Sequence, residues 1–254
     1  MPAAIPSSIL ASPRRIASAL CLFMWIAPLA HAQDAPKPQQ AVIMNSHGFL
    51  AAHPDLRWRA EGLEALQEDR AGEAFDYFKR AAKYADKPSQ AMVAEMLWTG
   101  TGTPMDRPLA YAWMDVAAER AYIPFLAKRE QYWNALSEAE QARALEVGAP
   151  VFDEYKDAVA KERLERLLRR AKRNVTGSRT GHVGSLQIMI PGPGGLMMQV
   201  DGATYYDDQY WEPEHYWAWQ DSVWKDPPTG TVSIKPLEVV EQGTTPASDD
   251  TDGN

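Results

Sequence analysis

The amino-acid sequence predicts a mainly α fold, in which a short stack of helix hairpins with capping helices precedes a small C-terminal β-hairpin and an irregular aromatic-rich segment. Three observations predict it. Residues 55–122 contain two copies of one helix-hairpin pattern. Apolar residues between 123 and 173 recur at helical spacing. From residue 174 the chain becomes rich in Gly, Ser and Thr and then alternates between apolar and polar residues.

Composition and charge limit what this chain can be. The 254 residues are 45% hydrophobic and 24% charged, which is ordinary for a globular protein and excludes a collagen-like, long coiled-coil or wholly disordered chain. The 26 basic residues are outnumbered by 34 acidic ones, so the net charge is −8. Because nucleic-acid binding depends on cations placed against phosphates, we expect no nucleic-acid partner.

Residues 1–32 have the pattern of a secretory signal peptide. Arg14 and Arg15 precede fifteen mostly apolar residues, and Ala30-His31-Ala32 supplies small residues for cleavage. The alternative is an uncleaved anchor, but fifteen residues are few for a bilayer and Pro28 interrupts them. We expect an exported protein, periplasmic rather than secreted, without an integral membrane span after cleavage. The sole cysteine, Cys21, lies in this segment, so no disulfide is expected in the mature chain.

Residues 33–54 are expected to be a lead-in, and residues 55–122 to form two helical repeats. Small and aromatic residues recur 36 positions apart in this region, since Ala74, Tyr77, Phe78, Ala81 and Ala82 match Ala110, Trp113, Met114, Ala117 and Ala118. Small residues let the helices of a hairpin approach closely, and aromatic ones fill the space between hairpins. A single hairpin leaves an apolar face uncovered, so the hairpins must stack.

The second unit has the longer inter-helix loop, Gly100-Thr-Gly102-Thr-Pro104-Met-Asp106. Its glycines allow backbone angles that β-carbons resist, which suits a sharp turn. On these residues the chain resembles two related families. The set Trp58, Gly62, Ala74, Phe78 and Ala81 stands at tetratricopeptide spacing, and Gly100–Ala118 is similar to a Sel-1-like repeat of exported bacterial type. The resemblance implies a short α-solenoid, usually an adaptor with no chemistry of its own.

Residues 123–173 are expected to supply three capping helices. Pro124–Leu136 carries an apolar stripe. Ser137 and Glu140 have capping-box spacing, which predicts a helix that ends at Gly148. The third helix is expected from about Val151 to Arg173. It ends in a basic run that either docks on an anionic surface or stays solvated, and the acidic chain favours the second alternative.

Residues 174–242 are expected to form an aromatic-rich region with a β-hairpin. Leu186–Ile190 and Leu196–Val200 alternate like strands, and the turn Pro191–Gly195 joins them. Thr231–Val240 is expected as an edge strand, because Pro236 interrupts its pattern. Residues 243–254 are expected to be a disordered acidic tail.

Between these strands, eight aromatic residues fall within the twenty positions from Tyr205 to Trp224. One hypothesis is a glycan-binding platform for peptidoglycan, formed by Tyr206, Trp211, Trp217 and Trp219. The other is that this segment folds back over the helices and packs its rings into them. We prefer the second, because a core without disulfides needs large apolar side chains.

The sequence contains no recognisable catalytic or metal-binding motif. The mature histidines have no zinc-binding spacing, and neither a phosphate-binding loop nor a nucleophile elbow occurs. We therefore expect no enzyme, no metal and no cofactor. Paired carboxylates can cleave glycosidic bonds, and Asp207 and Asp208 with Glu212 and Glu214 could supply such a pair. A glycan hydrolase that depends on Glu212 or Glu214 is the least favoured hypothesis.

The preferred function is a non-catalytic exported scaffold that binds another envelope protein or peptide. Candidate partner contacts are polar residues on the first predicted repeat helix, namely Arg57, Glu61 and Glu64. The larger rings of the repeats are expected mainly in the core: Trp58, Tyr77, Trp98, Trp113 and Trp133. The alternative is a peptidoglycan-binding module that uses the C-terminal aromatic segment.

Overall fold

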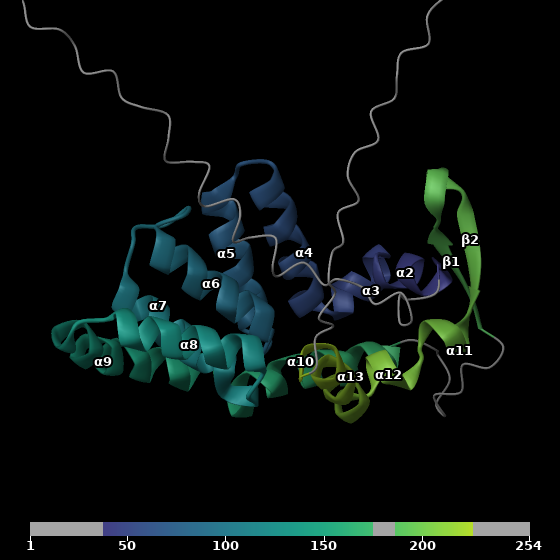
Figure 1. The fold of residues 1–254 in the computed structure, drawn as a ribbon. Coiled ribbons are helices and arrows are strands. Elements are labelled where there is room, and N and C mark those ends of the chain that lie inside the picture. Colours follow the sequence, from purple (N-terminus) through teal and green to yellow (C-terminus); the bar gives the residue numbers. More distant parts are fainter. Residues whose placement is uncertain (1–37, 175–185, 226–254) are drawn as a thin grey trace, which may run out of the picture.

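The computed structural model describes residues 38–174 and 186–225, and over these residues the chain is mostly helical with one two-stranded antiparallel sheet (Figure 1). The expected signal peptide, the Thr231–Val240 strand and the acidic tail lie outside the described residues. Within the described ranges, no helix is long and apolar enough to cross a membrane.

The region expected to be a lead-in forms two short helices, α2 (Pro38–Met44) and α3 (His47–Ala52). The Ser46 hydroxyl caps α3 by accepting a hydrogen bond from the backbone N–H of Phe49. Ile43 and Phe49 are buried in a core cluster with residues of the C-terminal segment. The sequence expectation missed these helices because the residues that cover them are distant along the chain.

Two pairs of contacting helices follow, as the repeat pattern predicts. They are α4 (Pro54–Gln67) with α5 (Ala71–Ala82), and α6 (Lys87–Thr99) with α7 (Arg107–Ala117). Asp86 caps α6 and Asp106 caps α7, each by accepting a backbone N–H three residues on at 3.1 Å. In both helices a proline in the first turn follows the cap, where its missing N–H costs nothing.

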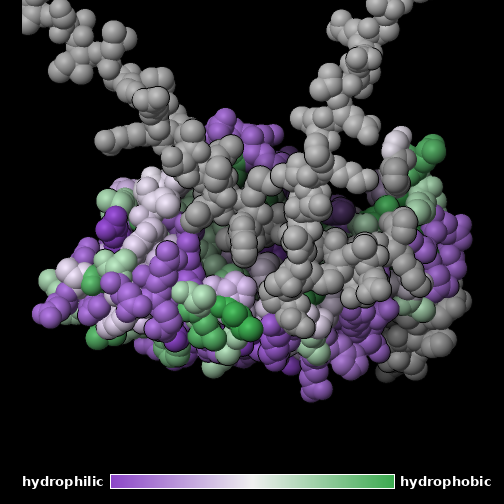
Figure 2. Space-filling view, viewed as in Figure 1, coloured by the Kyte–Doolittle hydropathy of each residue, from purple (hydrophilic) through white to green (hydrophobic). Residues whose placement is uncertain are grey.

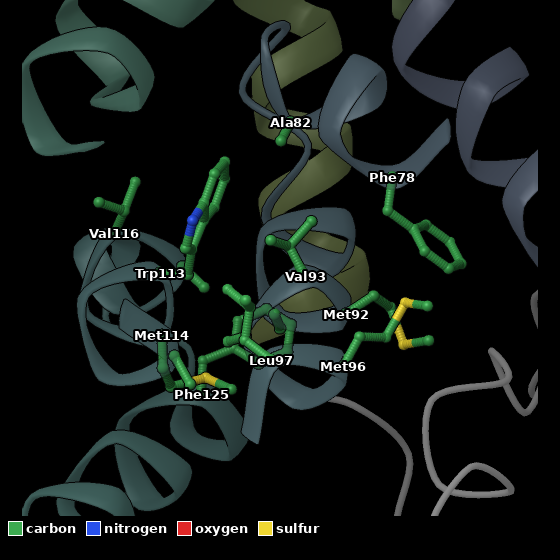
Figure 3. Close-up of a cluster of buried hydrophobic side chains, with 14 of the residues drawn as sticks. Phe78, Ala82, Met92, Val93, Met96, Leu97, Trp113, Met114, Val116 and Phe125 are labelled. Carbon is green, nitrogen blue, oxygen red and sulfur yellow. The ribbon is translucent and has the colours of Figure 1, made fainter. Parts of the chain in front are cut away.

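The main core lies between these pairs. Helix α6 is at its centre, because every residue from Lys87 to Leu97 is buried. Figure 3 shows how side chains of α6 meet Phe78 of α5 and Trp113 of α7. The small residues predicted at the helix contacts are fully buried: Ala74, Ala81, Ala82, Ala110 and Ala117.

Three further helices follow: α8 (Ile123–Ala135), α9 (Glu138–Tyr155) and α10 (Asp157–Asn174). The predicted capping box at Ser137 is present. The predicted end at Gly148 is wrong, because α9 continues through Pro150 and the next helix begins only at Asp157. Packing along α7 explains this, since Tyr155 is buried against the Trp113 ring at 4.4 Å. That contact outweighs the one backbone hydrogen bond lost at proline.

The predicted β-hairpin is confirmed. Strand β1 (Gln187–Pro191) pairs antiparallel with β2 (Met197–Asp201), and the turn contains the 3-10 helix η2 (Pro193–Gly195). Ile190 and Val200 face the second core cluster. The other face carries exposed apolar side chains, and Figure 2 shows hydrophobic residues at the outer end of this hairpin.

The aromatic-rich segment is helical, so the prediction that it is irregular is wrong. It forms α11 (Gly202–Tyr205), α12 (Asp208–Trp211) and α13 (Pro213–Lys225). Asp201 and Asp207 cap the first two through their carboxylates, and Pro213 opens the third. These local start signals were present in the sequence, but the density of aromatic residues obscured them.

Candidate functional site

The C-terminal aromatic segment packs into the protein, as the preferred hypothesis for it predicted. Trp211 is 2% exposed and donates its indole N–H to the Tyr205 carbonyl oxygen at 2.8 Å. Trp217 is 9% exposed and lies between two cations, with Arg120 at 4.8 Å and Lys161 at 5.0 Å from its ring centroid. Neither ring has a free face for a ligand.

The other two residues of the predicted glycan platform, Trp219 and Tyr206, are half-buried and have different surroundings. Trp219 lines a shallow depression of about 450 Å³ together with Asp207, Asp208, Gln209, His215, Ala218 and Ser222. Tyr206 is outside that lining and packs on Trp211 at 4.8 Å. The four predicted rings therefore do not form one platform.

Of the carboxylates considered for glycan hydrolysis, Asp207 and Asp208 line that depression, whereas Glu212 and Glu214 do not. Glu212 accepts a hydrogen bond from Lys172 of α10, and Lys172 also donates to Asp208 at 3.0 Å. Glu214 is exposed on α13. Part of the basic run at the end of α10 is thus paired with carboxylates of the chain itself. This agrees with the alternative in which the run does not dock on an anionic surface.

Helix α13 contacts the N-terminal ends of helices that precede it by many residues. The buried Tyr216 hydroxyl donates to Asp55 at the start of α4 and accepts from Gln220 at 3.1 Å. The Tyr122 hydroxyl, just before α8, donates to Asp221 of α13 at 2.6 Å. The sequence contained no signal for these contacts, because they join residues about 100 to 160 positions apart.

A buried ionic cluster joins α6, α10 and the 3-10 helix η1 (Ala118–Arg120). Lys87 donates to the Val116 carbonyl oxygen and to Glu119, both at 2.8 Å, and its ammonium nitrogen forms an ion pair with Asp157 at 3.0 Å. Arg120 donates to both oxygens of Asp157, at 2.6 and 3.0 Å. Two hydrogen bonds and an ion pair thus hold the buried ammonium, which makes this cluster a structural tie between the three elements.

The pKa values in this cluster follow from burial and charge. Burial lowers the pKa of Lys87, although the nearby carboxylates of Asp157 and Glu119 oppose this. Burial tends to raise the pKa of Asp157, but hydrogen bonds and charge from Arg120, with Lys87 and Lys161, outweigh it and hold that pKa well below its usual range. Asp157 is therefore held in its ionised form.

Nothing in the described ranges forms a metal centre, since no three His, Cys, Asp or Glu side chains there could hold one ion. A second shallow depression, of about 530 Å³, lies beside the inter-helix loop. Its wall includes Arg143, which donates to both oxygens of Asp106 at 2.8 and 2.7 Å. The charges of Arg143 and Asp106 neutralise each other, so neither side chain is free to bind a charged ligand.

A surface cluster on the first hairpin stands out by composition, and we call Arg57, Trp58, Tyr77 and Arg80 the Arg–Trp cluster. The Trp58 and Tyr77 rings stack with their centroids 5.6 Å apart and an interplanar angle of 13°. The guanidinium carbons of Arg57 and Arg80 lie 4.5 and 4.9 Å from the Trp58 centroid. This geometry is a cation–π arrangement on both arginines.

The prediction that Trp58 is mainly a core residue is wrong. Trp58 is half-buried and belongs to none of the described core clusters. Trp133 is also half-buried and outside them, with its ring tilted at 47° against Tyr111 at 4.8 Å. Trp113 is buried as predicted, while Tyr77 and Trp98 pack at the edge of the main core. Spacing placed Trp58 on a helix correctly, but it did not show that, among the described residues, Tyr77 of α5 covers only part of its ring.

The predicted partner contacts lie beside the Arg–Trp cluster. Glu61 approaches Arg57 at 3.9 Å, and both side chains are more than 40% exposed, so this ion pair contributes little. Glu64 is exposed one turn further along α4. Over the part of the chain that the structure describes, Arg80 has no carboxylate oxygen within 4.0 Å. Within the described ranges, its guanidinium is therefore exposed without a competing carboxylate.

Comparison with known proteins adds no family to this picture. No protein-family model, no curated protein and no solved structure matches the chain. Any function must therefore be argued from the residues and contacts described above.

Proposed function

We propose that this chain is a non-catalytic, exported scaffold of the short α-solenoid type, which binds another protein of the cell envelope through the Arg–Trp cluster. The observation that carries the proposal is a half-buried tryptophan flanked by two arginines on the surface of the first hairpin. Trp, Tyr and Arg are the residues that most often dominate the binding energy of protein interfaces. The contacts of the predicted residues Arg57 and Glu61 fall within or beside this cluster.

The geometry favours an acidic segment of the partner. A guanidinium that lies flat on a ring keeps its N–H edge available for the two oxygens of a carboxylate. The stacked rings restrict both arginines before binding, which lowers the entropy lost on association. One carboxylate would bind Arg80, and a second would displace Glu61 from Arg57.

The scaffold role is supported by how the helices are held together. Helices α4 to α7 share one core of alanines, aromatic rings and aliphatic or methionine side chains, and the buried charges of Lys87 and Arg120 pair with Asp157. Export is supported by the sequence of residues 1–32, which predicts the periplasm as the site of action.

The proposal is tested by fluorescence anisotropy with the mature chain and two labelled peptides. One peptide alternates Asp and Ser, and the other has Asn in place of Asp. We expect the Asp peptide to bind more tightly, with an affinity that falls as salt is added. The double variant R57Q/R80Q should weaken this binding about tenfold or more, which corresponds to about 1.4 kcal/mol.

The matched control is R166Q/R169Q on α10, where each arginine pairs with a glutamate one turn earlier. This control should bind the Asp peptide like the unchanged chain. Equal binding of the Asn peptide, or an equal loss in R166Q/R169Q, would contradict the proposed cluster.

A second candidate, peptidoglycan binding, is favoured by one observation, the depression beside Trp219 with its polar rim. It predicts that the mature chain co-sediments with purified peptidoglycan and that Trp219→Ala abolishes this. Tyr206→Ala is the control outside the depression. A glycan hydrolase would in addition have to release fragments from the same material, and Glu212→Gln or Glu214→Gln would have to stop that release.

A further inference from the structure

Helix α9 lies at the end of the described molecule that is opposite the β-hairpin (Figure 1). Its inner face packs on α7, where Ala144 is buried and a β-carbon on Gly148 would stand 3.4 Å from that of Ala112. A helix that closes a stack of helices needs a polar outer face, because its outer side chains meet water. The composition of the outer face of α9 therefore shows whether this helix is only a cap.

The outer face of α9 carries an apolar stripe. Leu145 and Phe152 are 66% and 43% exposed, and the alanines at 142 and 149 are exposed as well. These residues follow one another at intervals of three, four and three positions, which is the seam spacing of two packed helices. We call Ala142, Leu145, Ala149 and Phe152 the α9 seam. The seam is about 15 Å long, because a helix rises about 1.5 Å per residue.

The α9 seam is complementary in shape to a second copy of itself that runs antiparallel. Around a two-fold axis at residue 147, Ala142 faces Phe152 of the second copy. In the same register Leu145 faces Ala149 of the second copy. Each large side chain then meets a small one, which is the arrangement that lets two helices interdigitate at close range.

The same register places opposite charges together at both ends of the seam. Glu138 precedes Ala142 by one turn, and Lys156 follows Phe152 by one turn, so each Glu138 faces Lys156 of the other copy. Within the described ranges Glu138 has no cation within 4.0 Å. The Lys156 ammonium lies 5.1 Å from the Phe152 centroid, beside the seam. Its ion pair with Asp153 is weak, because the Asp153 side chain is 75% exposed.

We propose that α9 is a dimerisation surface, through which two copies of this chain pair antiparallel around a two-fold axis at residue 147. A two-fold interface requires a surface that is complementary to itself, and the α9 seam is so in both shape and charge. Because the seam is only two heptads long, the dimer forms and dissociates with concentration. It does not depend on the Arg–Trp cluster, but it carries two of these clusters, so a partner with two acidic segments would gain avidity.

Sedimentation of the mature chain at rising concentration, into the high micromolar range, tests the proposal. We expect a reversible equilibrium between monomer and dimer. Leu145→Ser should weaken the dimer about tenfold or more, because the two-fold axis makes the lost contact count twice. Leu196→Ser is the control, since Leu196 is 77% exposed and lies on the β-hairpin, outside α9. This control should dimerise like the unchanged chain.

Charge reversal tests the register. Glu138→Lys and Lys156→Glu should each weaken the dimer about fivefold or more, and E138K/K156E should restore it, because the swap recreates both ion pairs. Glu146 is exposed and would lie near its own counterpart at the two-fold axis, so Glu146→Gln should strengthen the dimer about twofold. Glu214→Lys makes the same change of charge on the exposed side of α13 and should have no effect.

A chain that remains monomeric at every concentration overturns the proposal, even if an added amphipathic peptide binds the α9 seam. An equal loss in Leu145→Ser and Leu196→Ser also overturns it. A dimer that E138K/K156E does not restore uses a different register or surface, whereas full restoration supports the antiparallel pairing. The variant R57Q/R80Q should dimerise like the unchanged chain, so failure of the Arg–Trp cluster in the peptide assay leaves this test independent.

Discussion

Gly62 of α4 lies directly against the Phe78 ring of α5, so closely that a β-carbon on Gly62 would stand 2.7 to 2.9 Å from three ring atoms. Phe78 is fully buried and belongs to the main core. The absence of a side chain at residue 62 therefore sets how near the two helices of the first hairpin approach. The small residues Gly62 and Ala74 predicted that these two helices approach closely, but the prediction placed Phe78 between neighbouring hairpins and not against Gly62.

Replacing Gly62 should destabilise the protein because the Phe78 ring has to move. We expect Gly62→Ala to lower the free energy of unfolding by about 1–3 kcal/mol, and Gly62→Leu to lower it further. Urea unfolding followed by tryptophan fluorescence measures both. Gly72→Ala on α5 is the control, since the nearest atom to its β-carbon is 3.8 Å away. It should be neutral or stabilising, and an equal loss at Gly72 would argue against nesting.

The inter-helix loop should show two different glycine effects. Gly100 and Gly102 both have positive φ, 74° and 70°. A β-carbon on Gly102 would in addition overlap the Ala71 carbonyl oxygen and lie 2.9 Å from the Gly72 nitrogen, at the start of α5. We expect Gly100→Ala to lower the free energy of unfolding by about 1–2 kcal/mol, mainly through backbone strain, since the nearest atom to its β-carbon is the Met105 Cβ at 3.3 Å.

Gly102→Ala should lower that free energy clearly more than Gly100→Ala does, because backbone atoms cannot yield as a side chain does. Thermal unfolding of the two variants side by side makes this comparison. Equal losses would mean that the loop does not press against α5.

The buried ammonium of Lys87 should be far more important for stability than the partly exposed Lys161 that contacts the same aspartate. Lys87→Met leaves Glu119 and Asp157 short of a buried cation, and we expect a loss of about 3–5 kcal/mol. Lys161, 3.2 Å from Asp157, is 29% exposed, so Lys161→Met should cost about 1 kcal/mol or less. Chemical denaturation at neutral pH measures both, and similar losses would contradict the assignment of Lys87 as the structural tie.

Local signals in the sequence predicted where helices begin. Features that depend on contacts between distant residues could not be predicted from it. The capping residues Asp86, Asp106 and Ser137 act within three residues of themselves, so their helix starts could be read from spacing. Whether the helix ends before Pro150 or continues through it depends on how α9 packs along α7. The sequence pattern contains no information about that contact.

The candidate sites show the same division. Whether Trp58 is a core or a surface residue depends on whether a further helix covers its face of α4. The spacing of residues along the chain contains no information about that. The burial of Asp55 at the start of α4 depends on Tyr216, which lies more than 150 positions away. The aromatic segment was expected to pack on the helices for want of disulfides, and its rings do so, but its helical form escaped the prediction.

Site-specific photocrosslinking in the host cells tests the central claim most directly. A photoreactive residue at Glu61, beside the Arg–Trp cluster, should give a discrete adduct with another protein. That adduct should disappear in R57Q/R80Q, persist in R166Q/R169Q, and be absent when the photoreactive residue replaces Glu162 on α10. If no adduct forms from position 61, or if the adduct survives R57Q/R80Q, the chain does not bind its partner through this cluster.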